Sequence, residues 1–137
     1  MRRAYTLLEL IFIVIILGIL SAVAIPRLFV SRSDANISNA RTQLAAIRSG
    51  ISLKYNDNLL QAKPEFPKKL DNANPNKLFE NVINIPIKDS GDKNGWHRVG
   101  YDKYTFMLDG KVANFKYDKT TGDFSCNDQN EICKSLQ

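Results

Sequence analysis

The 137-residue sequence has little of what most active sites and metal centres are built from. It contains one histidine, His97, and two cysteines, Cys126 and Cys133. An Asp- and Gly-rich stretch at residues 89–95 offers oxygen ligands, but it lacks the spacing and the terminal Glu of an EF-hand, so we interpret it as a solvated turn. No nucleophile–base pair or phosphate-binding loop stands out, so we expect neither an enzyme nor a cofactor or metal site.

Long runs of basic residues are also missing. The formal charge is +5, and a basic balance can favour DNA or anionic lipid as a partner. However, no run of Lys or Arg is longer than two residues. We therefore interpret the charge as spread over a solvated, Lys- and Asn-rich surface, with DNA binding kept as a lesser alternative. No internal repeat is visible, which excludes a repeat architecture.

Charged side chains are absent from residues 10–26, whereas the rest of the chain is polar. Residues 5–25 suit a membrane-spanning helix of about twenty residues. Arg2 and Arg3 precede them and favour a cytoplasmic N-terminus. Glu9 stands inside the apolar stretch, where an acidic side chain costs on the order of 3 kcal/mol on insertion scales and usually has a partner.

Two ordinary interpretations of this N-terminal stretch remain open. Residues 21–24 offer a small-residue site for cleavage by signal peptidase, which would make Ile25 the first residue. Alternatively, the stretch is a plain anchor that keeps Met1. Neither gives Glu9 a role, and Pro26 follows the cleavage site too closely to suit it.

A third interpretation rests on a resemblance that covers residues 2–30. A short basic leader ends in a small residue, and an aromatic residue, Thr, two aliphatic residues and Glu follow before a long apolar stretch with Pro26 near its end. This pattern resembles the N-terminus of type IV pilins and pseudopilins. Ala4 stands where that family usually has Gly, and Tyr5 where it more often has Phe. The residues that carry the core of the match are Ala4, Tyr5, Thr6, Leu7, Leu8, Glu9 and Leu10.

The resemblance implies a processing step. Residues 1–4 would be a leader, removed by a prepilin peptidase between Ala4 and Tyr5, and Tyr5 would then be N-methylated. It also implies the partners: membrane lipid before assembly, an inner-membrane assembly platform, and copies of this chain and related pilins in a filament. The head would lie in the periplasm, and the filament in the periplasm or outside the cell.

Elementary electrostatics gives this pattern a rationale. Cleavage would create an α-amino cation at Tyr5, in a medium of low dielectric constant where Glu9 is an anion. Pairing Glu9 of one subunit with the amine of a neighbour offsets part of the cost of each buried charge. A subunit in the wrong register would leave both charges unpaired. The hydroxyl of Thr6 could add a local hydrogen bond, although a tolerated helix residue is the simpler interpretation.

The apolar segment is expected to continue as one long helix over residues 5–55. Pro26 should kink it or loosen one turn rather than end it. Residues 5–26 would form the membrane and assembly half, and residues 27–55 an amphipathic half that lies on a globular head. Apolar residues recur at spacings of three and four on one face of this second half: Ile37, Ala40, Leu44, Ile47, Ile51 and Tyr55.

The predicted fold is therefore α+β, a long N-terminal helix packed on a small antiparallel sheet. Residues 56–94 are predicted to form an irregular connection rich in Pro and Asn, with a short helix near residues 76–84. Residues 95–137 are predicted to form an antiparallel meander, with turns at Asp109-Gly110 and Thr121-Gly122. Strands are expected at 104–108, 111–117 and 123–126, with a further one within 96–101. The candidate core residues are Phe106, Leu108, Phe115, Tyr117 and Phe124.

Two modifications are considered for the head. Cys126 and Cys133 lie downstream of a membrane-targeting segment, so a disulfide in an oxidising compartment is expected. Many type IV pilins carry a C-terminal disulfide loop, so the resemblance supports the same expectation. Asn36 lies in an Asn-x-Ser sequon that also resembles the acidic bacterial type, but such short patterns arise by chance and this one falls in the predicted helix. We therefore favour an unmodified Asn36 on the helix surface.

The expected function is that of a structural filament subunit, in a type IV pilus, a type II secretion pseudopilus or a DNA-uptake machine. Two alternatives remain. The chain could be a minor pilin whose head binds DNA or a surface, or an unrelated single-pass periplasmic protein.

Overall fold

Helix α1 (Leu7–Leu60) accounts for most of the first half of the chain. The computed structural model describes residues 4–127 and 129–137, without the side chains of residues 28–31. Of the predicted leader, residues 1–3 lie outside the described part. Pro26 lies inside α1, so the helix continues past it as predicted. The sequence predicted that the helix ends at Tyr55, but the backbone stays helical as far as Leu60.

The contacts divide the chain into two compact units, Met1–Ala35 and Asn36–Gln137. The first consists of the early part of α1 and the residues before it. The second, which we call the head, contains the rest of α1, the connection after it and all of the strands. The head thus joins a helix and a sheet in one body.

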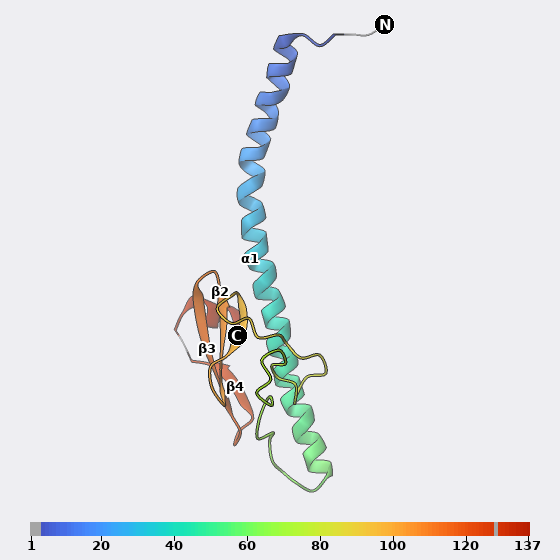
Figure 1. The fold of residues 1–137 in the computed structure, drawn as a ribbon, viewed down its shortest axis with the longest axis vertical. Helices are drawn as coiled ribbons and strands as arrows, with labels where there is room; N and C mark the ends of the chain where they lie inside the picture. The colour runs from blue at the N-terminus through green and yellow to red at the C-terminus, as the bar shows by residue number, and fades with distance from the viewer. Residues whose placement is uncertain (1–3, 128) are drawn as a thin grey trace. The chain divides into compact units, whose positions relative to one another are not determined.

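The sheet of the head has four antiparallel strands in the order β1-β2-β3-β4, each paired with its neighbour in sequence. The strands are β1 (Gly95–Arg98), β2 (Lys103–Leu108), β3 (Lys111–Asp118) and β4 (Asp123–Cys126). A short helix, α2 (Glu131–Leu136), follows the last strand. Figure 1 shows the strands beside the later part of α1, with the chain between α1 and β1 close to that helix. This meander on a long helix confirms the predicted fold class.

The hairpin between β2 and β3 forms at Asp109-Gly110, as the sequence predicts. Both residues have positive φ, 50° and 77°, which is the combination that a type I′ turn requires. The turn sets the register in which Leu108 lies opposite Lys111. This register places alternate residues of the two strands in the core.

The core lies between one face of the sheet and one stripe of α1. Ala40, Leu44 and Ile47 of the stripe are buried, and Ile37 packs against them partly buried. Nine buried side chains come from the described strands of the sheet: Trp96, Tyr104, Phe106, Leu108, Ala113, Phe115, Tyr117, Phe124 and Cys126. All five core candidates named from the sequence are among them. The aromatic rings of the core lie close together; for example, the ring centroids of Trp96 and Phe115 are 4.9 Å apart.

The prediction of a short helix near residues 76–84 is wrong. Leu78 instead forms an antiparallel bridge with Ile87, through mutual backbone hydrogen bonds of 2.7 and 3.1 Å. Phe79 has φ of +61°, a left-handed conformation that does not continue a right-handed helix. Leu78 and Phe79 are both fully buried. The burial of these two adjacent side chains therefore determines the backbone conformation here, and the helical spacing on which the prediction rested does not.

Candidate assembly segment and head groove

The apolar N-terminal part of α1 is exposed, since none of the described side chains of residues 4–27 is buried. None of its most apolar 18-residue window is buried. Among the described residues, this is the one helix that is long and apolar enough to cross a membrane. Its position near the N-terminus is compatible with single-pass insertion.

The residues predicted to be processed lie just before the helix. Ala4 and Tyr5 are exposed and not helical, and Tyr5 keeps 78% of its surface accessible. The Thr6 hydroxyl oxygen accepts a hydrogen bond from the Glu9 amide at 3.3 Å, and the Thr6 carbonyl accepts one from the Leu10 amide at 3.2 Å. Thr6 therefore serves as the N-cap of α1. The sequence suggested only a local bond for this hydroxyl, and the Thr-x-x-Glu spacing of a capping box is the signal for this role.

Glu9 occupies the first turn of α1 and is exposed. An acidic residue there complements the positive end of the helix dipole. In the described part of the chain, no cationic group forms an ion pair with the Glu9 carboxylate. The Glu9 carboxylate therefore has no cationic partner among the described residues.

The two cysteines form the expected disulfide, Cys126–Cys133, with Cα atoms 6.0 Å apart. It joins the end of β4 to α2, a helix that we did not predict. Asn130 caps α2 by accepting a hydrogen bond from the Cys133 amide at 2.9 Å. The side-chain amide of Gln137 donates to the Cys126 carbonyl at 2.6 Å. The C-terminal segment is therefore fixed to the sheet by a covalent bond and by hydrogen bonds.

Two lesser candidates from the sequence lie apart from these features. Asn36 is exposed on helical backbone in α1. In the turn at residues 89–95, the Asp89 carboxylate is engaged by the protein itself: it accepts from the amides of Gly91 (2.8 Å) and Arg98 (3.3 Å) and lies 2.6 Å from His97 Nδ1. Burial opposes the ionisation of Asp89, but these bonds hold its pKa below the ordinary value. His97, for which the sequence indicates no chemistry, thus orders this turn.

A buried polar cluster of the head was also missed. Asp71 accepts hydrogen bonds from Arg98 Nη1 and from the Tyr104 hydroxyl, each at 2.7 Å, and from the Ala73 amide at 3.0 Å. Burial and the Asp71 carboxylate raise the pKa of Tyr104 far above its ordinary value. The cluster fixes the irregular connection to β1 and β2. Its members are far apart in sequence and follow no spacing rule, so no sequence signal could have brought them together.

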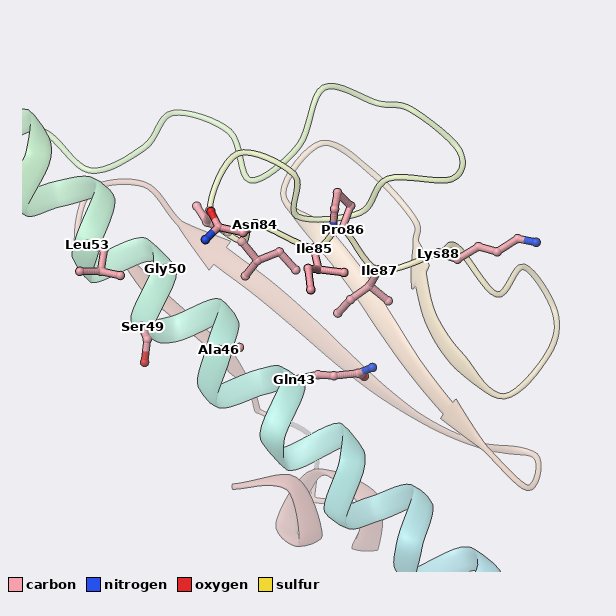
Figure 2. A pocket seen from close by; sticks show the side chains of 12 residues that line it. Gln43, Ala46, Ser49, Gly50, Leu53, Asn84, Ile85, Pro86, Ile87 and Lys88 are labelled. Carbon is pink, nitrogen blue, oxygen red and sulfur yellow. The ribbon is translucent and has the colours of Figure 1, made fainter.

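The head carries an open groove of about 740 Å³ between α1 and the connection at residues 82–88, which we call the head groove. Figure 2 shows Ile85, Pro86 and Ile87 on the connection, across from Ala46 and Leu53 on α1. The lips are apolar yet accessible, since Ile85 is 85% and Leu53 is 68% exposed.

The floor of the head groove depends on a glycine. A Cβ atom at Gly50 would overlap the carbonyl oxygen of Val82, so only glycine lets the connection lie this close to α1. The groove is therefore a built feature of the head, held by a tight backbone contact. It was not predicted from the sequence, because a groove between a helix and an irregular connection has no local signature.

Comparison of the chain with models of known protein families, with curated proteins and with solved structures finds no match.

Proposed function

We propose that this chain is a structural subunit of a type IV pilus-like filament or of a type II secretion or DNA-uptake pseudopilus. In this proposal a prepilin peptidase removes residues 1–4 and exposes the amine of Tyr5. The subunit stays inserted in the inner membrane, with its head in the periplasm, until it assembles through the N-terminal part of α1. Its role is structural rather than catalytic.

One observation carries the proposal: an acid, Glu9, stands at the start of a long apolar helix whose most apolar window is wholly unburied in the described part of the chain. An apolar helix alone would suit any anchor. A plain anchor has no use for the acid, because an unpaired carboxylate near the membrane is costly and usually functional. Its position four residues after Tyr5 matches the spacing of the resemblance in residues 2–30.

The chemistry of the pair follows from the charges. Before processing there is no amine at Tyr5, because that nitrogen is part of a peptide bond. After processing, the amine of one subunit and the Glu9 carboxylate of a neighbour can neutralise each other as the helices leave lipid. Since an unpaired buried charge is much more costly than a paired one, the pair favours one stagger between neighbours.

Replacement of Glu9 by Gln tests this role. Gln keeps the size and polarity of the side chain but removes its charge, so the chain should still insert, while filament yield should fall at least ten-fold. The matched control is Asp34→Asn, which makes the same change on an exposed part of the same helix beyond the apolar stretch. Quantitative immunoblots of the membrane and filament fractions separate insertion from assembly. Unchanged filament yield in Glu9→Gln would refute the pairing.

A further inference from the structure

We propose that the head groove is a docking surface for the apolar N-terminal helix of a second copy of this chain. The inference rests on the proposed function and deepens it, because it names where on the head a neighbour's helix lies. It follows from the chemistry of the groove, the shape of its helix wall and the uncovered apolar residues of the same chain.

The walls of the head groove carry almost no charge. Of its twelve lining residues, one is charged, Lys88, and Figure 2 shows its side chain extending away from α1. The lips are Leu53 and Ile85, both largely exposed. Accessible apolar side chains around a groove mark an interaction site for an apolar partner. A charged occupant would find a single charged partner, Lys88, among the lining residues.

The α1 wall of the groove has a shape that suits a helix. From Gln43 to Leu53 the wall covers about three turns, roughly 15 Å of helix. Ala46 and Ser49 are small and exposed on this wall. Small side chains let the backbone of another helix approach closely, whereas a wall of large side chains would hold it off. The groove therefore suits a helix that presents apolar residues at i, i+3, i+4 and i+7.

The same chain supplies an occupant of matching chemistry. It contains an uncharged apolar helical stretch, and the most apolar window of that helix is wholly unburied. Gly18 has no side chain, which leaves room for close approach to this helix, and among the described residues beyond its own helical turn no atom would lie within 4 Å of a Cβ there. Once such a helix leaves lipid, it must be covered by protein. A second copy supplies an uncharged helical stretch, residues 10–26, to a groove with a single charged residue, so the two surfaces are complementary.

The test is photo-crosslinking in cells that make the full chain. A benzophenone amino acid replaces Ile85 in an untagged copy, and a tagged copy without the probe is made in the same cells. After irradiation, the tagged copy is purified, digested with trypsin and analysed by mass spectrometry. The same probe at Val99, which is 60% exposed and outside the head groove, is the matched control.

The expected product joins position 85 to the tryptic peptide that ends at Arg27 of the tagged copy, with at least five-fold less of it from position 99. Crosslinking of position 85 to a head peptide, to another protein or to lipid would overturn the inference, and so would equal yields from the two positions. Absence of any crosslink at position 85 would overturn it as well.

Failure of this inference can be distinguished from failure of the proposed function. If filaments form and the mature chain begins at Tyr5, but position 85 does not reach the apolar helix, only the docking surface is wrong. If the mature chain does not begin at Tyr5, the proposed processing is wrong, whatever position 85 contacts. As a second readout, Ile85→Asp should reduce filament yield several-fold with processing unchanged, whereas Val99→Asp should not.

Discussion

In the N-terminal unit every described side chain of residues 4–27 is exposed, whereas the head buries Trp96, Tyr104 and their neighbours almost completely. Both regions are rich in apolar residues, but only the head supplies its own partners for them. Contacts among the head's own residues therefore stabilise the head. Under the proposed function, lipid or other chains cover the N-terminal unit, so changes in the two regions should have separate consequences.

The largest difference between the regions should come from removing a phenylalanine. Phe124 is buried, with its ring centroid 5.3 Å from that of Phe115 and 5.6 Å from that of Phe79. Phe124→Ala should lower the free energy of unfolding of the head by about 3–5 kcal/mol, because it leaves a cavity among aromatic rings. Phe12→Ala, at an exposed site, should leave it unchanged. Denaturant titration followed by Trp96 fluorescence measures both, and similar losses in the two variants would break the comparison.

A smaller contrast is expected between two glycines of α1. Gly50→Ala forces its new methyl group against the Val82 carbonyl, so we expect a loss of about 1–3 kcal/mol in head stability. Gly18→Ala meets no neighbour among the described residues and should leave the head unchanged. Thermal unfolding of the two variants in detergent compares them. If Gly50→Ala left the head as stable as in the original chain, the connection could move away from α1 without cost.

The smallest effect is expected from pH and is confined to the head. Because the folded state lowers the pKa of Asp89, its ionised form stabilises the head above the ordinary value of 3.8, and this contribution is lost as the pH falls below it. The unfolding free energy should therefore fall less between pH 5 and pH 3 in Asp89→Asn than in the original chain. Asp92→Asn, an exposed aspartate in the same turn, should retain the original pH dependence. Identical acid profiles for all three chains would contradict this role of Asp89.

Local and periodic features of the fold could be predicted from the sequence. The alternation in β3 placed Phe115 and Tyr117 in the core, and Asp109-Gly110 specified the hairpin before it. The helical spacing of Leu44 and Ile47 specified the buried stripe of α1. In each case the decisive contacts lie close in sequence or repeat with a fixed period.

Features that depend on distant contacts could not be predicted. Leu78 and Phe79 have spacing compatible with a helix, but pairing with Ile87 and burial in the core give them an irregular backbone. The head groove and the Asp71 cluster likewise depend on where the connection lies against α1 and the sheet. The exception is α2, for which Asn130 before Glu131 was a local cap signal that we overlooked.

The most direct test of the central claim is the mass of the N-terminal peptide of the chain in assembled filaments. The account predicts that this peptide begins at Tyr5 with a methylated amine, so that a cation exists for the Glu9 carboxylate of a neighbour. A peptide that begins at Met1 or at Ile25 in assembled filaments would contradict the claim.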